Sequence, residues 1–213
     1  MPRPLPTLDP RHDDLLANWS LSWSTLGLTP PAGLVEALLS AWAESSRHYH
    51  ALQHLAECIA WFEREKDTAE RPAEVALALW FHDAIYDVHA HDNEQRSADW
   101  ARDALHAARL PEDATARIHA LVMATQHHAV PQGRDAELLV DIDLAILGAP
   151  PVRFAEYEQQ IRTEYSYVPS ALFEARRRHL LQRFFEREPL YATEGMRAAC
   201  EAQAKSNLRT AIG

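Results

Sequence analysis

A histidine and an aspartate follow directly on a run of apolar residues in this chain. The run covers residues 76–81 (ALALWF), and the pair is His82-Asp83. A segment that is apolar on nearly every side indicates a buried central helix, so the pair should lie at the end of such a helix. Burying an imidazole and a carboxylate without partners costs several kcal/mol. A divalent metal ion would satisfy both groups; the alternative is a helix end where Asp83 forms a salt bridge and His82 packs.

The composition favours an all-helical fold. Glycine occurs only 6 times in 213 residues, 47% of the residues are hydrophobic, and Leu, Ala, Glu and Arg are plentiful. We expect a single domain overall, with an N-terminal extension (1–30), a helical core (31–150) and C-terminal helices packed on that core (151–213). The expected helices cover about 13–26, 29–44, 48–64, 72–86, 92–109, 111–127, 135–147, 151–165, 169–188 and 193–211.

Two histidines at helical spacing precede the apolar run. His50 and His54 are four residues apart, so they share a helical face beside an apolar stripe that should point to the core. At about 100° per residue, His54 lies closer to that stripe than His50. A metal ligand must point inward, so we prefer His54 as the ligand and assign His50 a supporting role or a substrate contact. The alternative is two surface or hydrogen-bonded histidines.

Two acids lie within a later, almost wholly apolar segment. Asp141 and Asp143 belong to the stretch 138–147 and lie roughly 200° apart on a helix, so one of them should point inward. The inward acid needs a cation, which is either an arginine or a metal. Carboxylate oxygens and imidazole nitrogens suit Mn, Fe, Co, Ni, Zn or Mg. We therefore expect a divalent metal cofactor, without a choice among these ions.

The net charge and the spacing of the cysteines do not indicate a nucleic-acid-binding protein or a cysteine-based zinc motif. The formal net charge is −10, so nothing indicates binding to the backbone of a nucleic acid polymer. Cys58 and Cys200 match no zinc spacing, and a reduced, cytoplasmic setting is the simplest interpretation. The N-terminus shows no apolar signal region, and no apolar run approaches membrane-spanning length. The sequence leaves a homodimer open.

Six stretches of the chain resemble a known family. They are Arg47–His54, Trp80–Asp87, Asp92–Ala98, Ala124–His128, Asp141–Gly148 and Ile161–Tyr165. They resemble the HD superfamily of metal-dependent phosphohydrolases, and more narrowly a bacterial group of predicted phosphohydrolases within it, over roughly residues 40–210. The resemblance implies an HD-domain-like bundle of about ten helices with a helical C-terminal appendage. The superfamily's metal ligands would fall on His54, His82, Asp83 and Asp143.

Further histidines bear on the number of metals. His50 competes with His54 for the first ligand position, and only His127 or His128 could serve a second metal. One metal is therefore the safer expectation.

The resemblance also implies an activity, the hydrolysis of a phosphate ester by a metal-activated water. The expected substrate is a small phosphorylated metabolite, with a nucleotide favoured over a cyclic nucleotide by superfamily analogy alone. Asp83 and Glu94 are the predicted catalytic residues. Glu94 would orient the water or protonate the leaving group, unless it is only an acid favoured at a helix start. The predicted substrate contacts are Arg47, His50, Asp87, Ser97, Arg162 and Arg176.

Two other functions stay open at this point. The first is a non-catalytic metal- or nucleotide-binding module on the same fold, which would need no positioned Glu94. The second is a structural helical protein whose histidines and acids pair internally.

Overall fold

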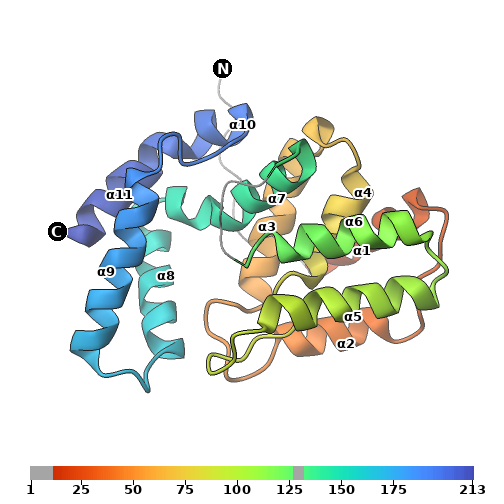
Figure 1. The fold of residues 1–213 in the computed structure, drawn as a ribbon, viewed down its shortest axis with the longest axis horizontal. Coiled ribbons are helices and arrows are strands. Elements are labelled where there is room, and N and C mark those ends of the chain that lie inside the picture. The colour runs from red at the N-terminus through yellow and green to blue at the C-terminus, as the bar shows by residue number, and fades with distance from the viewer. Residues whose placement is uncertain (1–11, 127–131) are drawn as a thin grey trace.

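A computed structural model describes residues 12–126 and 132–213, and within these ranges the chain forms helices and no strand (Figure 1). This confirms the predicted all-α fold. None of the described helices is long and apolar enough to cross a membrane. The helices are α1 (His12–Thr25), α2 (Leu34–Trp42), α3 (Leu52–Glu65), α4 (Pro72–Phe81), α5 (Asn93–Ala107), α6 (Glu112–Met123), α7 (Arg134–Asp143), α8 (Pro151–Glu164), α9 (Ser170–Glu186), α10 (Glu194–Met196) and α11 (Ala202–Ile212), with the short turns η1 (Lys66–Thr68), η2 (Leu144–Gly148) and η3 (Arg197–Glu201).

Helix α4 lies at the centre of the structure. All of its residues from Ala73 to Phe81 are buried, and it packs against α1, α3, α6 and α7 among its neighbours. The ring centroid of Trp80 lies 5.0 Å from that of Trp19 in α1, and its Nε1–H donates to Oδ1 of Asn18 at 3.0 Å. Helix α1 is therefore packed into the core, although it falls within the segment predicted as an N-terminal extension.

The C-terminal helices lie beside the bundle formed by α1–α7. Figure 1 shows α8, α9 and α11 together on one side, and α8 and α11 both pack against η2, which follows α7. Gly148 ends η2 at a point of close approach, where a Cβ atom would lie only 2.6 Å from the Cβ of Cys200. Glycine permits this approach. The C-terminal helices are thus anchored next to the helix that carries the two buried acids.

Helix α4 ends earlier than the sequence predicts. It stops at Phe81 instead of near Tyr86, and the chain then turns. Carbonyl groups of its last turn find donors outside the helix: the Leu79 carbonyl lies 2.7 Å from Nδ1 of His82, and the Trp80 carbonyl accepts from Nε1–H of Trp42 at 3.0 Å. Arg47 holds the turn that follows, because its guanidinium donates to the carbonyl oxygens of Asp83 at 2.5 Å and of Ala84 at 2.9 Å. As a result, His82 and Asp83 occupy a turn instead of a regular helix, and both side chains can reach the same point.

Candidate metal centre

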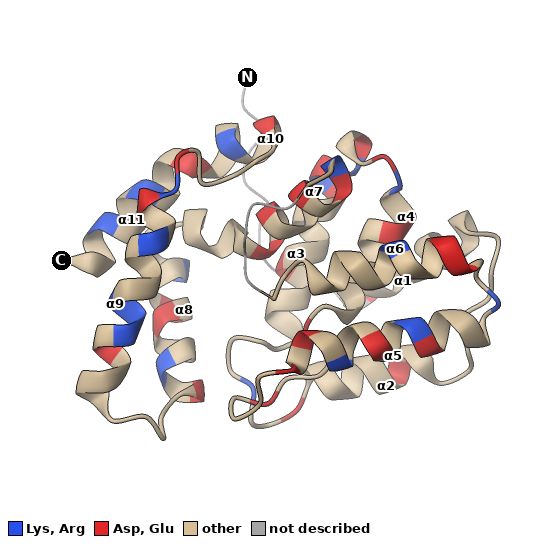
Figure 2. Cartoon of the chain, in the orientation of Figure 1, with Lys and Arg blue, Asp and Glu red and all other residues tan. Residues whose placement is uncertain are grey.

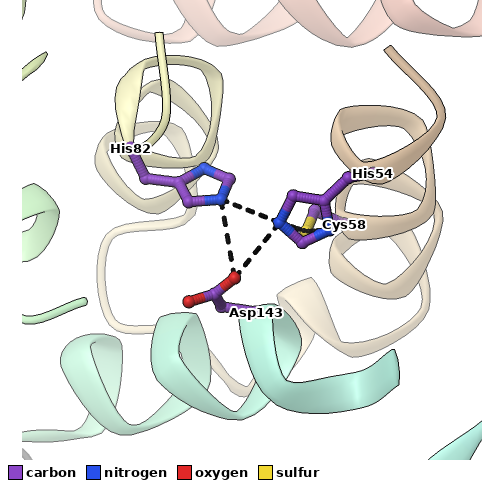
Figure 3. A group of neighbouring side chains, drawn as sticks. All are labelled: His54, Cys58, His82 and Asp143. Carbon is purple, nitrogen blue, oxygen red and sulfur yellow. Dashed lines mark hydrogen bonds and ion pairs between the residues drawn. The ribbon is translucent and has the colours of Figure 1, made fainter. Parts of the chain in front are cut away.

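Three side chains, carried by α3, by α7 and by the turn after α4, meet in the core (Figure 3). His54 lies in the first turn of α3, His82 follows the last residue of α4, and Asp143 is the last residue of α7. The Nε2 atoms of His54 and His82 are 3.1 Å apart. Oδ1 of Asp143 lies 3.2 Å from Nε2 of His54 and 3.6 Å from Nε2 of His82. The two histidines are 2% and 0% exposed, so the group is buried.

A backbone hydrogen bond fixes the orientation of His82. Its Nδ1 lies 2.7 Å from the carbonyl oxygen of Leu79. Because a carbonyl oxygen only accepts, Nδ1 carries a proton, and Nε2 is the nitrogen that faces the centre of the group and can bind a metal once it is deprotonated. Trp42 packs against this imidazole with ring centroids 5.4 Å apart, and its own Nε1–H donates to the carbonyl oxygen of Trp80. Metal-binding histidines adopt the same arrangement.

The spacing of the donor atoms fits a divalent ion. Bonds from imidazole nitrogen or carboxylate oxygen to such an ion are about 2.0–2.2 Å, which places neighbouring ligand atoms roughly 3.0–3.6 Å apart. The separations within the group of His54, His82 and Asp143 are 3.1, 3.2 and 3.6 Å. The described residues therefore include a buried group that can hold a metal ion.

Two side chains stand next to this group as candidates for a fourth ligand. Oδ2 of Asp83 lies 3.4 Å from Nε2 of His82 and 3.8 Å from Nε2 of His54. Sγ of Cys58 lies 3.8 Å from Nε2 of His54 and 3.7 Å from its Nδ1. These nearly equal distances place the thiol against the His54 ring, whereas the Asp83 oxygen approaches the Nε2 atoms of both histidines. The geometry favours Asp83.

The sequence did not predict Cys58 as a metal ligand. The candidate ligand atoms of His54, Cys58, His82 and Asp143 all lie within 4.8 Å of one another. Cys58 follows His54 by four residues, so the two share a face of α3, and this spacing is the sequence signal that a search for zinc motifs misses. Burial raises the pKa of the Cys58 thiol well above its usual value, and the nearby Asp143 raises it further. Without a metal, the side chain is therefore a neutral thiol.

The acids give the centre a negative potential. Burial on its own would lower the pKa of His82, but Asp83 and Asp143 outweigh that effect and raise the pKa to about 9. A site that raises the pKa of an imidazole favours cations, and a metal ion that binds there takes the place of the proton.

A cavity of about 510 Å³ lies beside the candidate metal centre. Asp83 and Asp143 line it, and so do the predicted site residues His50, Glu94 and Arg176. Helices α8 and α9 supply the opposite wall, and Figure 2 shows Lys and Arg positions along α9. The aromatic residues of the lining are Tyr49, Tyr86, Tyr157, Tyr165, Tyr167, Phe173 and Phe184.

His50 lies in the wall of this cavity, outside the metal-binding group. Its Nδ1 is 2.8 Å from Oε2 of Glu164, and its ring stacks on Tyr86 with centroids 3.9 Å apart. His54 is the member of the pair whose Nε2 meets His82. The structure therefore places His54 in the candidate metal centre and His50 next to it.

Arg47 and Ser97 hold the backbone around Asp83. The guanidinium of Arg47 donates to the carbonyl oxygens of Asp83 and Ala84, and the Ser97 hydroxyl accepts from the N–H of Ile85 at 3.0 Å. Neither residue is among the described residues that line the cavity. Their contact with a substrate stays a prediction, whereas the contacts observed position the turn that carries Asp83.

Asp87 lies in the loop between α4 and α5, and Arg162 lies in the last turn of α8. Oδ1 of Asp87 accepts from the N–H of His89 at 2.9 Å. Arg162 donates to the carbonyl oxygens of Tyr165 at 2.7 Å and Val168 at 3.2 Å, and so holds the turn between α8 and α9. Their predicted substrate contacts are likewise untested.

The two histidines considered for a second metal, His127 and His128, lie outside the described residues.

No family model matches the chain, and no curated protein or solved structure matches it either. These comparisons therefore do not identify the HD superfamily. The fold and the site together define an all-helical protein with a buried group, made of His54, Cys58, His82 and Asp143, that can hold a metal ion.

Proposed function

We propose that this protein is a metal-dependent phosphohydrolase of the HD superfamily that acts on a small phosphorylated metabolite, with a nucleotide as the favoured substrate. One observation carries the proposal. Asp83 and Asp143 both lie against the paired imidazoles and both line the cavity of about 510 Å³. A metal held by His54, His82, Asp83 and Asp143 would therefore face a space where a substrate can bind, of the size usual for small-molecule sites.

The cavity lining supports a phosphorylated organic substrate. Arg176 lines the cavity and supplies a cation that can bind a phosphate group. Tyr86, Tyr165 and Tyr167 line it as well, and their rings offer surfaces on which a nucleobase can stack. A phosphate near the metal and an aromatic group between the tyrosines would use both features.

The proposed chemistry combines the metal with an acid of the chain. A bound divalent ion lowers the pKa of a bound water and withdraws charge from a phosphoryl oxygen. Glu94 lines the same cavity as Asp83 and lies in the first turn of α5. Carboxylate oxygens accept hydrogen bonds, so Glu94 can orient the attacking water.

Metal content is the first test. Elemental analysis of protein purified without chelator should find about one metal per chain. Asp83→Ala should lose that metal, whereas Asp87→Ala, a control at an exposed residue in the following loop, should keep it. Wild-type protein that takes up no metal, even after soaking with Mn or Ni, would contradict the proposal and leave a structural helical protein.

Hydrolysis is the second test. Metal-loaded protein should release phosphate from a panel of phosphomonoesters, phosphodiesters and nucleotides, and Glu94→Gln should slow that release with metal content unchanged. The matched control is Glu112→Gln, an exposed acid in the first turn of α6. Protein that binds metal and nucleotide but hydrolyses no member of the panel would be a non-catalytic binding module.

A further inference from the structure

Glu164, the last residue of α8, is a buried acid that faces the loop before α3. Its Oε1 accepts three backbone N–H groups, those of His48 at 2.8 Å, Tyr49 at 2.8 Å and His50 at 3.0 Å. Three donors on one oxygen anchor this loop to the C-terminal helices. Oε1 of the carboxylate therefore accepts hydrogen bonds from the backbone.

The other oxygen of Glu164 contacts side chains. Oε2 lies 2.8 Å from Nδ1 of His50, and the hydroxyl of Tyr86 donates to the same oxygen at 3.4 Å. The His50 ring is clamped between this contact and the stacked ring of Tyr86. The orientation of His50 in the cavity wall thus depends on Glu164.

The ionisation of Glu164 decides which nitrogen of His50 carries the proton. Burial raises the pKa of Glu164, but the hydrogen bonds from His50 and from the backbone outweigh it and hold the pKa at about 2. An ionised carboxylate only accepts hydrogen bonds, so Nδ1 of His50 must be the donor. Nε2 is then the ring nitrogen that is left for the cavity, which His50 lines together with Asp83.

We infer that Glu164 is a positioning residue for His50: it holds the neutral imidazole in the Nδ1–H form, so that Nε2 accepts a hydrogen bond from an O–H group in the cavity. The inference rests on the proposed function, because that O–H group belongs either to the attacking water or to a hydroxyl of the substrate. Glu164 itself contacts neither.

Glu164→Gln separates the two functions of the carboxylate. The glutamine keeps an oxygen for the three backbone N–H groups but replaces Oε2 by an NH₂ group, which only donates. His50 must then accept at Nδ1 and carry its proton on Nε2. We expect nitrogen NMR of zinc-loaded protein to show His50 as the Nδ1–H form in the wild type and as the Nε2–H form in Glu164→Gln, with the signal assigned through its loss in His50→Gln.

The kinetic consequence distinguishes the two sources of the O–H group. Changes in the partners that orient a metal-binding histidine typically cost about 10–100-fold in activity, and we expect a loss of this order in Glu164→Gln. A fall in kcat with little change in KM assigns the bond to the attacking water, and a rise in KM assigns it to a substrate hydroxyl. An altered His50 form with unchanged kcat and KM would overturn the inference.

Two further variants serve as controls for the effect of Glu164→Gln. Tyr86→Phe removes the second donor to Oε2 and should leave His50 in the Nδ1–H form. Glu156→Gln changes an exposed acid of the same helix and should leave both the NMR signals and the kinetics unchanged. Wild-type protein in the Nε2–H form would refute the positioning role even if Glu164→Gln did not fold. Failure of the wild type to hydrolyse any ester would instead refute the proposed function, because the NMR result needs no turnover.

Discussion

Asp141 and Asp143 lie two residues apart at the end of α7, and both are buried, with 2% and 9% of their surface exposed. Their partners differ. Oδ1 of Asp141 accepts from the N–H of Ala192 at 2.9 Å, and Oδ2 accepts from the N–H and the hydroxyl of Thr193, both at 2.7 Å. Asp143 instead lies against the Nε2 atoms of His54 and His82.

The difference shows that burial of an acid does not by itself indicate a metal site. The partners of Asp141 are backbone N–H groups and a hydroxyl group, which donate hydrogen bonds to its carboxylate. These bonds join α7 to the segment before α10. The partners of Asp143 are imidazole nitrogens, which become metal ligands when they lose a proton. The type of donor around the acid therefore decides between a structural link and a candidate metal centre.

The largest expected effect separates these two acids directly. Asp143→Asn should lose nearly all of the bound metal, because it removes a charged ligand and leaves an amide beside the two histidines. Asp141→Asn should keep the metal, because Asp141 lies outside the group of donor atoms. Elemental analysis of both variants, purified side by side, measures the effect. If both variants lost the metal equally, the loss would reflect a disturbance of α7 as a whole, and the contrast drawn between Asp141 and Asp143 would be wrong.

A second effect concerns Glu57, a buried acid beside Cys58 that has a cation of its own. Arg153 donates to its two oxygens at 2.6 and 3.1 Å, and so links α3 to α8. Arg153→Met leaves the charge of this acid buried without a cation, which should lower the free energy of unfolding by about 3–5 kcal/mol. Urea unfolding measures the loss.

The double variant Glu57→Leu/Arg153→Met serves as the control for that prediction. It removes both charges and should recover most of the stability. Metal content should stay near that of the wild type in the double variant, because Glu57 already has a cation in the chain. A double variant that folds well but has lost its metal would place Glu57 in the candidate metal centre.

Asp141 should make a smaller contribution to stability. Asp141→Ala removes the acceptor for the N–H groups of Ala192 and Thr193, both of which are half-buried. We expect a loss of about 2 kcal/mol, because unpaired and partly buried donors cost about 1–3 kcal/mol each and water can reach these two. Thr193→Val removes only the hydroxyl donor and should cost less. Thermal unfolding of metal-loaded protein, compared with the wild type, measures both losses.

The sequence predicts the fold class and much of the candidate centre because those features are local. The apolar run of α4 and the low glycine content indicate buried helices, and the all-α fold is confirmed. His54 follows from helical spacing and His82 from the need of buried polar groups for partners, whereas the choice of Asp143 over Asp141 is what the resemblance to the HD superfamily implies. The structure brings all three together. Where a local rule applies, such as the inward direction of His54, the prediction agrees with the structure.

The features that the sequence did not predict depend on contacts between distant segments. Helix α4 ends at Phe81, and the turn that follows is held by Arg47 from an earlier segment of the chain; no local signal marks that contact. The start of α2 at Leu34, later than expected, follows from the positive φ of Gly33 just before it. His50 lies 114 residues before Glu164 in the sequence, so the contact between them becomes visible only in the folded chain.

The smallest expected effect is that of a substitution at Cys58, which tests whether the thiol is the fourth metal ligand. The geometry favours Asp83, so Cys58→Ser should keep the metal content of the wild type. Cobalt-loaded wild-type protein should then lack the absorption band that a thiolate bound to cobalt produces. If the band is present in the wild type and absent in Cys58→Ser, the thiol is a ligand. That outcome would shift the expected metal from ions that prefer oxygen toward zinc or iron, because a thiolate is a soft ligand. The comparison between the two acids of α7 would still hold, since Asp143 belongs to the group with either fourth ligand.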